Sequence, residues 1–108
     1  MIRRGMRAAA DAAVPAVLDA VVAALRSGRT VRDGLEAAAE HGLLAPVLRD
    51  VLSRSEHAPL RDALDRLASA HPLPSLRFAA VAMVLALDSG AAQATTLETA
   101  AHRARDRV

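Results

Sequence analysis

The chain has 108 residues and a formal net charge of +2, and arginine supplies all 14 of its basic side chains. It has no cysteine, which excludes disulfides, thiolate metal sites and a cysteine nucleophile, and its one aromatic residue, Phe78, argues against a module that stacks on nucleic-acid bases. Because alanine and leucine are abundant and hydrophobic residues make up 53% of the chain, we expect a single soluble helical domain over residues 1–108, with a basic, alanine-rich lead-in at 1–13 and a helical bundle at 14–107.

The positive charge is concentrated at the two ends of the sequence. Residues 1–7 hold three arginines and no acid, and residues 103–108 hold three arginines and one aspartate, whereas the rest of the chain has more acids than arginines. Such ends can simply keep a domain soluble, but arginines that flank a membrane also favour its cytoplasmic side. The segment Ile2–Ala13 lacks the long apolar core of a secretion signal, so we expect no signal peptide.

The first two predicted helices are delimited by turn and cap residues. Apolar residues recur three and four positions apart over 15–26, which predicts a helix with Pro15 in its first turn; alternatively, the alanine-rich segment before it extends this helix backwards. Gly28 is expected to follow the helix in a left-handed conformation. Thr30 is expected to cap the second helix, and Gly42 is expected to end it.

Three further helices are predicted over 45–55, 59–71 and 75–89. Pro46 is expected in the first turn of the first of these, and Pro59 is expected at the start of the second. The helix over 75–89 is apolar nearly all round, which implies that it is buried, and Gly90 is expected to end it.

A sixth helix is predicted from a start within 92–96 to about Arg105. Thr95 and Glu98 have the spacing of a capping box, which favours the later start. No segment shows the sustained alternation of polar and apolar residues that a half-buried strand requires. The expected fold class is therefore all-α.

No group of residues has the spacing that catalysis, a cofactor or a metal requires. The sequence contains no HExxH, no GxSxG and no glycine-rich phosphate loop. The histidines lie on separate segments, where surface and capping roles are more common than metal binding: His41, His57, His71 and His102. We therefore predict a protein that is not an enzyme, with no catalytic residue, no cofactor, no metal and no small-molecule substrate.

One cluster of charged residues on the predicted 59–71 helix is a candidate interaction face: Arg61, Asp62, Asp65 and Arg66. Their spacing allows ion pairs between residues four apart, each worth about 0.3–0.5 kcal/mol. The cluster is therefore either a solvated face that these pairs stabilise or a docking face for another protein.

The second and third predicted helices are short and adjacent, as in a helix-turn-helix. The would-be recognition helix over 45–55 offers Arg49 and Arg54 but no Asn, Gln or Lys to read base edges. The sequence therefore favours no nucleic-acid partner.

Several segments, in a fixed order, carry a resemblance to a known family. The first is LRSGRTVRDGLE at 25–36, a turn followed by a capped helix, and the second is PLRDALDRLA at 59–68. A long apolar helix over 76–90 and a last helix over 97–107 that ends in arginine complete the pattern. Over roughly 14–107, this order resembles the cytoplasmic F domain of type II secretion and tight-adherence pilus systems.

The resemblance implies an antiparallel bundle of about six helices, in a non-catalytic domain of a bacterial inner-membrane platform protein whose flanking membrane spans lie outside this sequence. It also implies that the platform couples a hexameric ATPase to the extraction of pilin subunits from the membrane, and that it self-associates. The basic ends would then lie near the cytoplasmic face of the inner membrane.

Two other functions stay open on the residues alone. One is a freestanding soluble adaptor that binds the helix of another protein in a groove. The other is a DNA-binding regulator, which would show a steep salt dependence of its affinity for a duplex.

Overall fold

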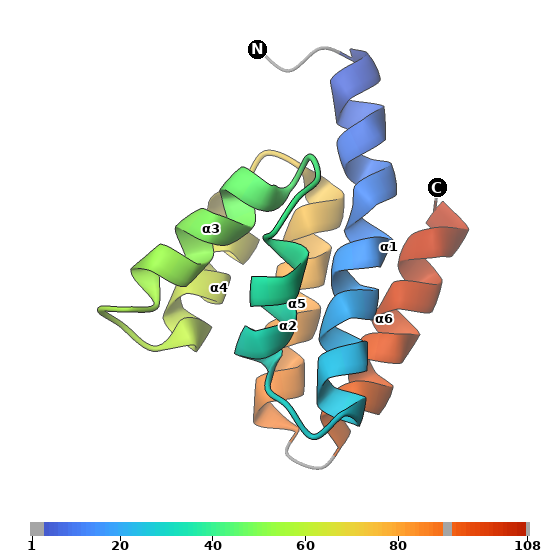
Figure 1. Cartoon of the computed structure of the whole chain (residues 1–108). Coiled ribbons are helices and arrows are strands. Elements are labelled where there is room, and N and C mark those ends of the chain that lie inside the picture. Colours follow the sequence, from blue (N-terminus) through green and yellow to red (C-terminus); the bar gives the residue numbers. More distant parts are fainter. Residues whose placement is uncertain (1–3, 90–91, 108) are drawn as a thin grey trace.

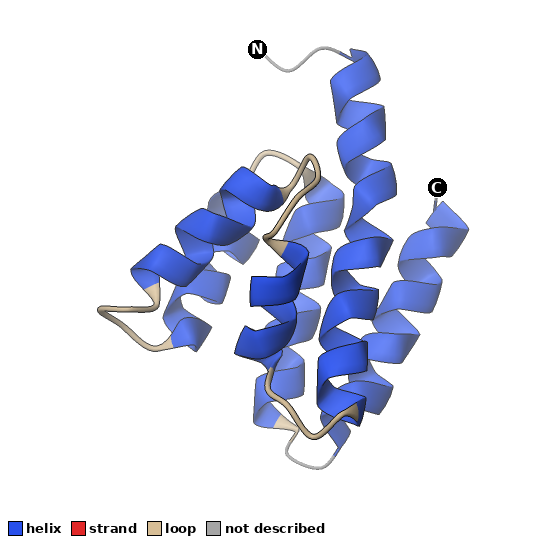
Figure 2. Ribbon diagram, viewed as in Figure 1, coloured by secondary structure: helices blue, strands red, loops and turns tan. Residues whose placement is uncertain are grey.

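The computed structural model of the chain describes residues 4–89 and 92–107. Within these ranges the chain is all-α, as predicted, and contains no strand. Consecutive helices run in opposite directions (Figure 1) and are joined by short loops (Figure 2). The helices are α1 (Arg4–Arg26), α2 (Val31–Ala38), α3 (Ala45–Arg54), α4 (Leu60–Ala70), α5 (Pro74–Asp88) and α6 (Gln93–Arg107).

Helix α1 is longer than the helix over 15–26 that the apolar periodicity predicts. It begins at Arg4 and passes through Pro15 without interruption, so the backward extension is confirmed and the first-turn position of Pro15 is wrong. A proline inside a helix removes one backbone hydrogen bond. The loss is tolerated here because Pro15 is buried beside Val14, where helix packing holds the backbone in place.

The turn after α1 follows from the conformational freedom of glycine. Gly28 adopts a φ of 80°, as predicted. Its N–H donates to the carbonyl of Leu25 over 3.1 Å, and the N–H of Arg29 donates to the carbonyl of Ala24 over 2.8 Å. These two bonds form a Schellman motif, which satisfies carbonyls at the end of the helix and fixes the direction of the chain into α2.

Thr30 caps α2, as predicted, through two reciprocal hydrogen bonds. The backbone N–H of Asp33 donates to Thr30 Oγ1 over 3.1 Å, and the backbone N–H of Thr30 donates to Asp33 Oδ2 over 3.0 Å. Such a box satisfies two N–H groups that the first turn of a helix leaves unpaired. It stabilises a helix of only eight residues.

Two predicted boundaries differ from the structure. Helix α2 ends at Ala38. Gly42, with a φ of 103°, lies in the loop between α2 and α3, where the chain reverses direction, and Leu44 in the same loop is buried. Helix α6 starts at Gln93 and not at the capping-box spacing, because Thr95 is inside the helix and its carbonyl accepts a hydrogen bond from the Thr99 hydroxyl. The predicted turn at Gly90 lies outside the described residues.

All six helices contribute to a single hydrophobic core. Helix α1 packs between α2 and α6, and α5 packs against α4 and α6 (Figure 1). Pro59 takes the cap position of α4, and that helix packs against α5. The largest fully buried side chains are Val14, Leu18, Val21, Val31, Leu35, Leu48, Leu64, Leu76, Met83 and Leu97.

Helix α5 is not buried on every side, contrary to the prediction. Ala79, Ala80 and Met83 are fully buried, but Val81 is 46% exposed and Leu85 is 55% exposed. The neighbouring helices α4, α6 and α1 cover the rest of its circumference and leave this strip open. An apolar helix face that the bundle leaves uncovered is the main candidate for contact with another molecule.

By length and composition alone, Gly5–Arg26 of α1 is apolar enough to cross a membrane. The core helix of a soluble protein passes the same test, and from Val14 onwards this helix packs in the core. Its first residues differ, because Gly5 to Ala9 are all exposed. Helix α1 therefore has a packed second half and an uncovered beginning that extends past the bundle (Figure 1).

Candidate functional site

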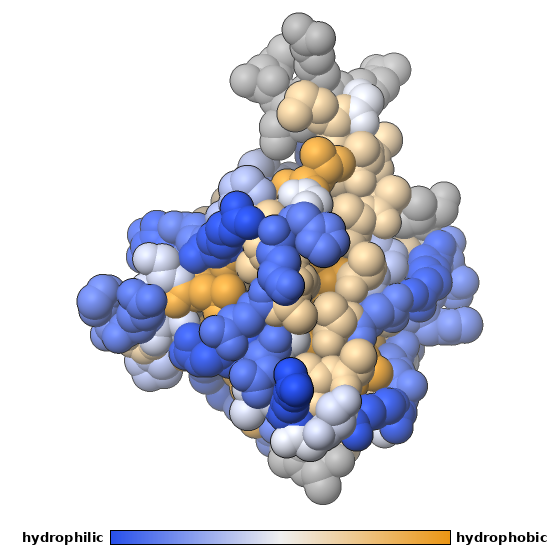
Figure 3. Space-filling model, in the orientation of Figure 1, coloured by the Kyte–Doolittle hydropathy of each residue, from blue (hydrophilic) through white to orange (hydrophobic). Residues whose placement is uncertain are grey.

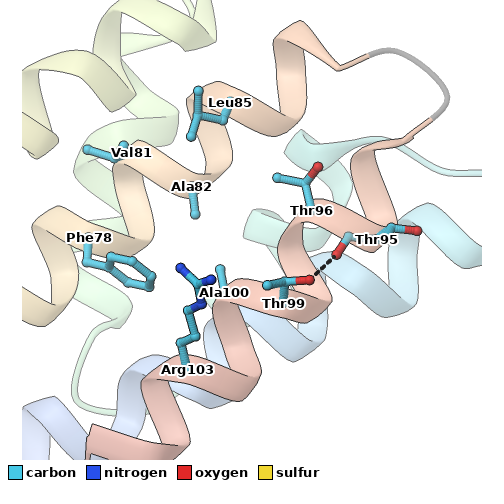
Figure 4. Close-up of a pocket in the computed structure, with 9 residues that line it drawn as sticks. All are labelled: Phe78, Val81, Ala82, Leu85, Thr95, Thr96, Thr99, Ala100 and Arg103. Carbon is cyan, nitrogen blue, oxygen red and sulfur yellow. Dashed lines mark hydrogen bonds between the residues drawn. The ribbon is translucent and has the colours of Figure 1, made fainter.

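The uncovered strip of α5 and the adjacent side of α6 form a groove, which we call the α5–α6 groove. Its volume is about 360 Å³, within the range typical of ligand and peptide sites. Figure 4 shows the residues that line it: Phe78, Val81, Ala82, Leu85, Thr95, Thr96, Thr99, Ala100 and Arg103.

The lining of the α5–α6 groove is apolar except for threonines and one cation. The Thr99 hydroxyl donates to the carbonyl of Thr95 over 3.1 Å, so it is engaged within α6. At one end the side chains of Arg103 and Phe78 point toward one another (Figure 4). This arrangement can hold an apolar side chain or helix face with an acidic group near Arg103, and it places no nucleophile beside a general base.

The α5–α6 groove was not predicted from the sequence. Its signal was present in the spacing of Phe78, Val81 and Leu85, which lie three and four residues apart and so share one side of a helix. Because α5 is apolar on its other sides as well, periodicity alone did not show which side the bundle would leave open. The positions of α4 and α6 determine which side of α5 stays uncovered.

The predicted charged face of α4 is exposed, and one of its two expected ion pairs forms. Arg61 lies 3.7 Å from Asp65 and also pairs with Asp88 of α5. The described residues contain no ion pair between Asp62 and Arg66. Because these pairs are about half exposed, each contributes at most about 1 kcal/mol. Arg61 therefore joins α4 to the end of α5, while Asp62 and Arg66 face solvent.

Two further ion pairs connect α1 and α6. Arg26 pairs with Glu98, and Arg105 pairs with Asp19. Both pairs are about half exposed and lie at well-separated levels along the two helices. They align the first and last helices of the chain side by side and in opposite directions.

His71 has a structural role in the α4–α5 turn. Its Nδ1 accepts a hydrogen bond from the backbone N–H of Leu73 over 3.0 Å, and its carbonyl accepts one from Arg77 over 3.0 Å. Partial burial lowers the pKa of His71, and the nearby Arg77 charge lowers it further. The other three histidines are exposed. Among residues 4–89 and 92–107 no cluster of three potential metal ligands occurs.

A local contact also lowers the pKa of Asp33. The hydrogen bond from the Thr30 backbone N–H is the main cause that lowers the pKa of Asp33, and the bond with the Thr30 side chain adds to it. The carboxylate of Asp33 is thus part of the cap of α2, which gives it a structural role.

The arginines of the would-be DNA recognition helix are occupied within the protein. Arg49 donates to the carbonyl of Glu40 over 3.0 Å, and Arg54 pairs with Asp50 over 2.9 Å. A recognition helix needs such side chains free to reach base edges. Helix α3 instead uses them to hold its own surface and the preceding loop.

Comparison with known proteins gives one match. The family model described as "Type II secretion system (T2SS), protein F" matches residues 17–108, which takes in the packed part of α1 and all the helices that follow. No curated protein and no solved structure matches the chain.

Proposed function

The chain belongs to the protein F family of type II secretion systems, and we propose that it is the non-catalytic cytoplasmic domain of a platform protein that links an assembly ATPase to the extraction of pilin subunits. Members of this family are inner-membrane platform proteins of secretion and pilus systems. The single observation that carries the proposal is the family match, because it spans nearly the whole helical bundle.

The surface of the bundle supports a role in assembly. The α4 face presents Asp62 and Arg66 to solvent, and the α5–α6 groove presents Val81 and Leu85. Exposed apolar patches beside charged groups are typical of protein–protein contacts. We propose that these two surfaces contact the hexameric ATPase, other inner-membrane assembly components and further copies of the platform, and that no nucleic acid or small-molecule substrate is involved.

A freestanding adaptor is the second candidate, and the α5–α6 groove is the observation that favours it. A helix of another protein could lie in this groove without any membrane. The two candidates differ in where the protein resides in the cell, because a platform is integral to the inner membrane and an adaptor is soluble.

Fractionation of the producing cells distinguishes these candidates. With an antibody against this domain, the platform proposal predicts a native product larger than the 11.3 kDa chain that stays with the inner membrane after a high-salt wash. A soluble product of about that mass would exclude the platform and leave the adaptor. Release by salt alone would indicate a peripheral protein and would also count against the proposal.

A further inference from the structure

The α5–α6 groove combines uncovered apolar side chains with one cation that lacks an acidic partner. Val81 and Leu85 are 46% and 55% exposed, and the Arg103 side chain points toward Phe78 at one end (Figure 4). Among the described residues, no carboxylate lines the groove, and none forms an ion pair with Arg103. Because a charge that is covered without a partner is costly, a ligand that fills the groove must bring a negative group to this end.

The acids on the other side of Arg103 are already paired. Arg103 also borders a furrow between α1 and α6, which Asp19 and Glu98 line as well. Asp19 pairs with Arg105, and Glu98 pairs with Arg26. These two carboxylates therefore hold α1 and α6 together, and the charge of Arg103 remains for a ligand in the α5–α6 groove.

The walls of the groove favour a helix over an extended segment as the ligand. Both walls are helices, whose backbone groups bond within each helix, and the Thr99 hydroxyl donates to the carbonyl of Thr95 over 3.1 Å. An extended segment would find no backbone partner here, whereas a helix satisfies its own backbone groups. Phe78 and Leu85 are seven positions apart, about 10 Å along α5, which matches two turns of a helix with anchors three, four and seven residues apart.

A second copy of this chain does not complement the groove. In a symmetric dimer the same surface patch lies on both subunits. Two facing grooves would cover both copies of Arg103 and supply a carboxylate to neither, since the lining contains none among the described residues. Charge complementarity therefore favours a different protein as the occupant.

The other uncovered apolar surface, along α1, lacks such a selective feature. Figure 3 shows the face that α1, α2 and α3 form, with hydrophilic residues over α2 and α3 and apolar residues along α1. Apart from Met6, the exposed apolar side chains of the described part of α1 are alanines, which bury little area each. Asp19 and Arg26, the exposed charges in the second half of this helix, are both paired with α6.

We propose that the α5–α6 groove binds an amphipathic helix of another protein, with its apolar side chains against Val81 and Leu85 and a carboxylate paired with Arg103. The groove sets the position of the helix through its apolar contacts, and Arg103 selects partners that carry an acid at that end. This inference rests on the proposed function, because it names the kind of partner that one of the two proposed contact surfaces takes.

A pair of synthetic peptides tests the proposal on the 108-residue chain. Each is an alanine-based helix of about 15 residues with leucines three and four positions apart, and both ends are capped so that they carry no charge. One peptide has a glutamate one turn beyond the last leucine, and the other has a glutamine there. We expect the glutamate peptide to bind about fivefold more tightly in a fluorescence anisotropy titration, which is the upper range for an ion pair at an exposed site.

Variants of the chain locate the binding. Arg103→Gln should remove the preference for the glutamate peptide and leave the affinity for the glutamine peptide unchanged, and Leu85→Asp should abolish binding of both. The matched controls are Arg29→Gln, at another exposed arginine, and Leu43→Asp, at another apolar side chain that is 57% exposed. Both controls should bind the peptides as the unmodified chain does. Melting curves establish that each variant is folded.

Three results would overturn the proposal. The first is no saturable binding of either peptide up to about 1 mM. The second is equal affinity for the two peptides, which would remove the acid from the requirement. The third is self-association of the chain in analytical ultracentrifugation that Leu85→Asp abolishes, because the groove would then hold a second copy.

The peptide measurement and the cell fractionation fail independently. Peptide affinity depends on the groove alone, whereas fractionation reports on membrane integration. An inner-membrane product together with no peptide binding would refute this inference and leave the platform function standing. A soluble product of the mass of this chain, together with peptide binding, would refute the platform function and leave the groove assignment in place.

Discussion

Gly34 of α2 lies so close to Val21 of α1 that a Cβ atom on residue 34 would overlap the Cα atom of Val21. The same Cβ would lie 3.1 Å from the carbonyl oxygen of Ala20. Both contacts are with backbone, which cannot rotate out of the way. The closest approach of α1 and α2 therefore depends on the absence of a side chain at this position.

Gly34→Ala is accordingly expected to destabilise the protein, although alanine is the better helix former by about 1 kcal/mol. The helices must separate, at a cost of about 1–3 kcal/mol, which lowers the Tm by about 4–8 °C per kcal/mol. Thermal unfolding followed by circular dichroism measures the change. Gly5→Ala is the control, because a Cβ there meets open space, and it should leave the Tm the same or slightly higher.

Thr30→Ala should destabilise the protein by about 1 kcal/mol, because it leaves the Asp33 N–H without its acceptor at the start of a short helix. Thr30→Ser keeps the oxygen and should retain most of the stability. Urea denaturation of the three proteins gives the difference in the free energy of unfolding. Equal losses for Ala and Ser would show that the methyl group of Thr30, and not the cap, is what matters.

Stability should fall as the pH is lowered through the ordinary pKa of histidine, about 6.5. The pKa of His71 is lower in the folded protein, so the unfolded chain binds its proton more readily, and the free energy of unfolding decreases below that pH. Protonation also blocks Nδ1 from accepting the Leu73 N–H.

His71→Gln tests this origin of the pH dependence. Between about pH 7.5 and about pH 5.5 the variant should show a flatter slope of stability against pH than the unmodified protein. His57→Gln, at an exposed position in the α3–α4 turn, should leave the slope unchanged. The interpretation is wrong if the two variants give the same slope.

Val84→Asp should prevent folding, because Val84 is 8% exposed and an unpaired charge in the core costs several kcal/mol. Val81→Asp, three residues earlier on the same helix, should fold with nearly the original Tm, since Val81 is 46% exposed. Circular dichroism and melting curves compare the two. Normal folding of Val84→Asp would show that this side of α5 is not part of the core.

Replacing Arg61 and Arg66 with Glu should leave the fold intact but impair pilus or secretion-system assembly, if the α4 face docks a partner. Loss of the exposed pairs of Arg61 costs only about 1 kcal/mol. Replacing Arg54 and Arg29 with Glu is the matched control for this charge reversal. Arg54, like Arg61, has an ion-pair partner four residues away, and Arg29, like Arg66, is exposed. Assembly at the normal level in the Arg61/Arg66 variant would exclude this docking face.

Much of the fold could be predicted from local signals in the sequence. Gly28 and Thr30 are in the conformations that their residue types favour, because a Schellman turn and a cap involve only neighbours in the chain. Leu64 is fully buried, as helical periodicity indicates. The family resemblance, which the family model confirms, rests on the same local signals in their order along the chain.

The features that were missed depend on how helices meet. The need for glycine at position 34 arises only from the packing of α2 against α1. The exposure of Leu85 depends on the position of α6 relative to α5. Thr95 and Glu98 have capping-box spacing, but packing of α6 along α5 extends the helix past that signal.

The ion pairs between α1 and α6 join residues 72 and 86 positions apart in the sequence, whereas most other helix contacts are between consecutive helices. Closing so long a loop costs more conformational entropy than joining neighbours, so local pairs form first during folding. We expect α6 to dock onto α1 last. Until it does, the facing sides of α1 and α6 stay uncovered, and misassembly between newly made copies would begin at these uncovered sides.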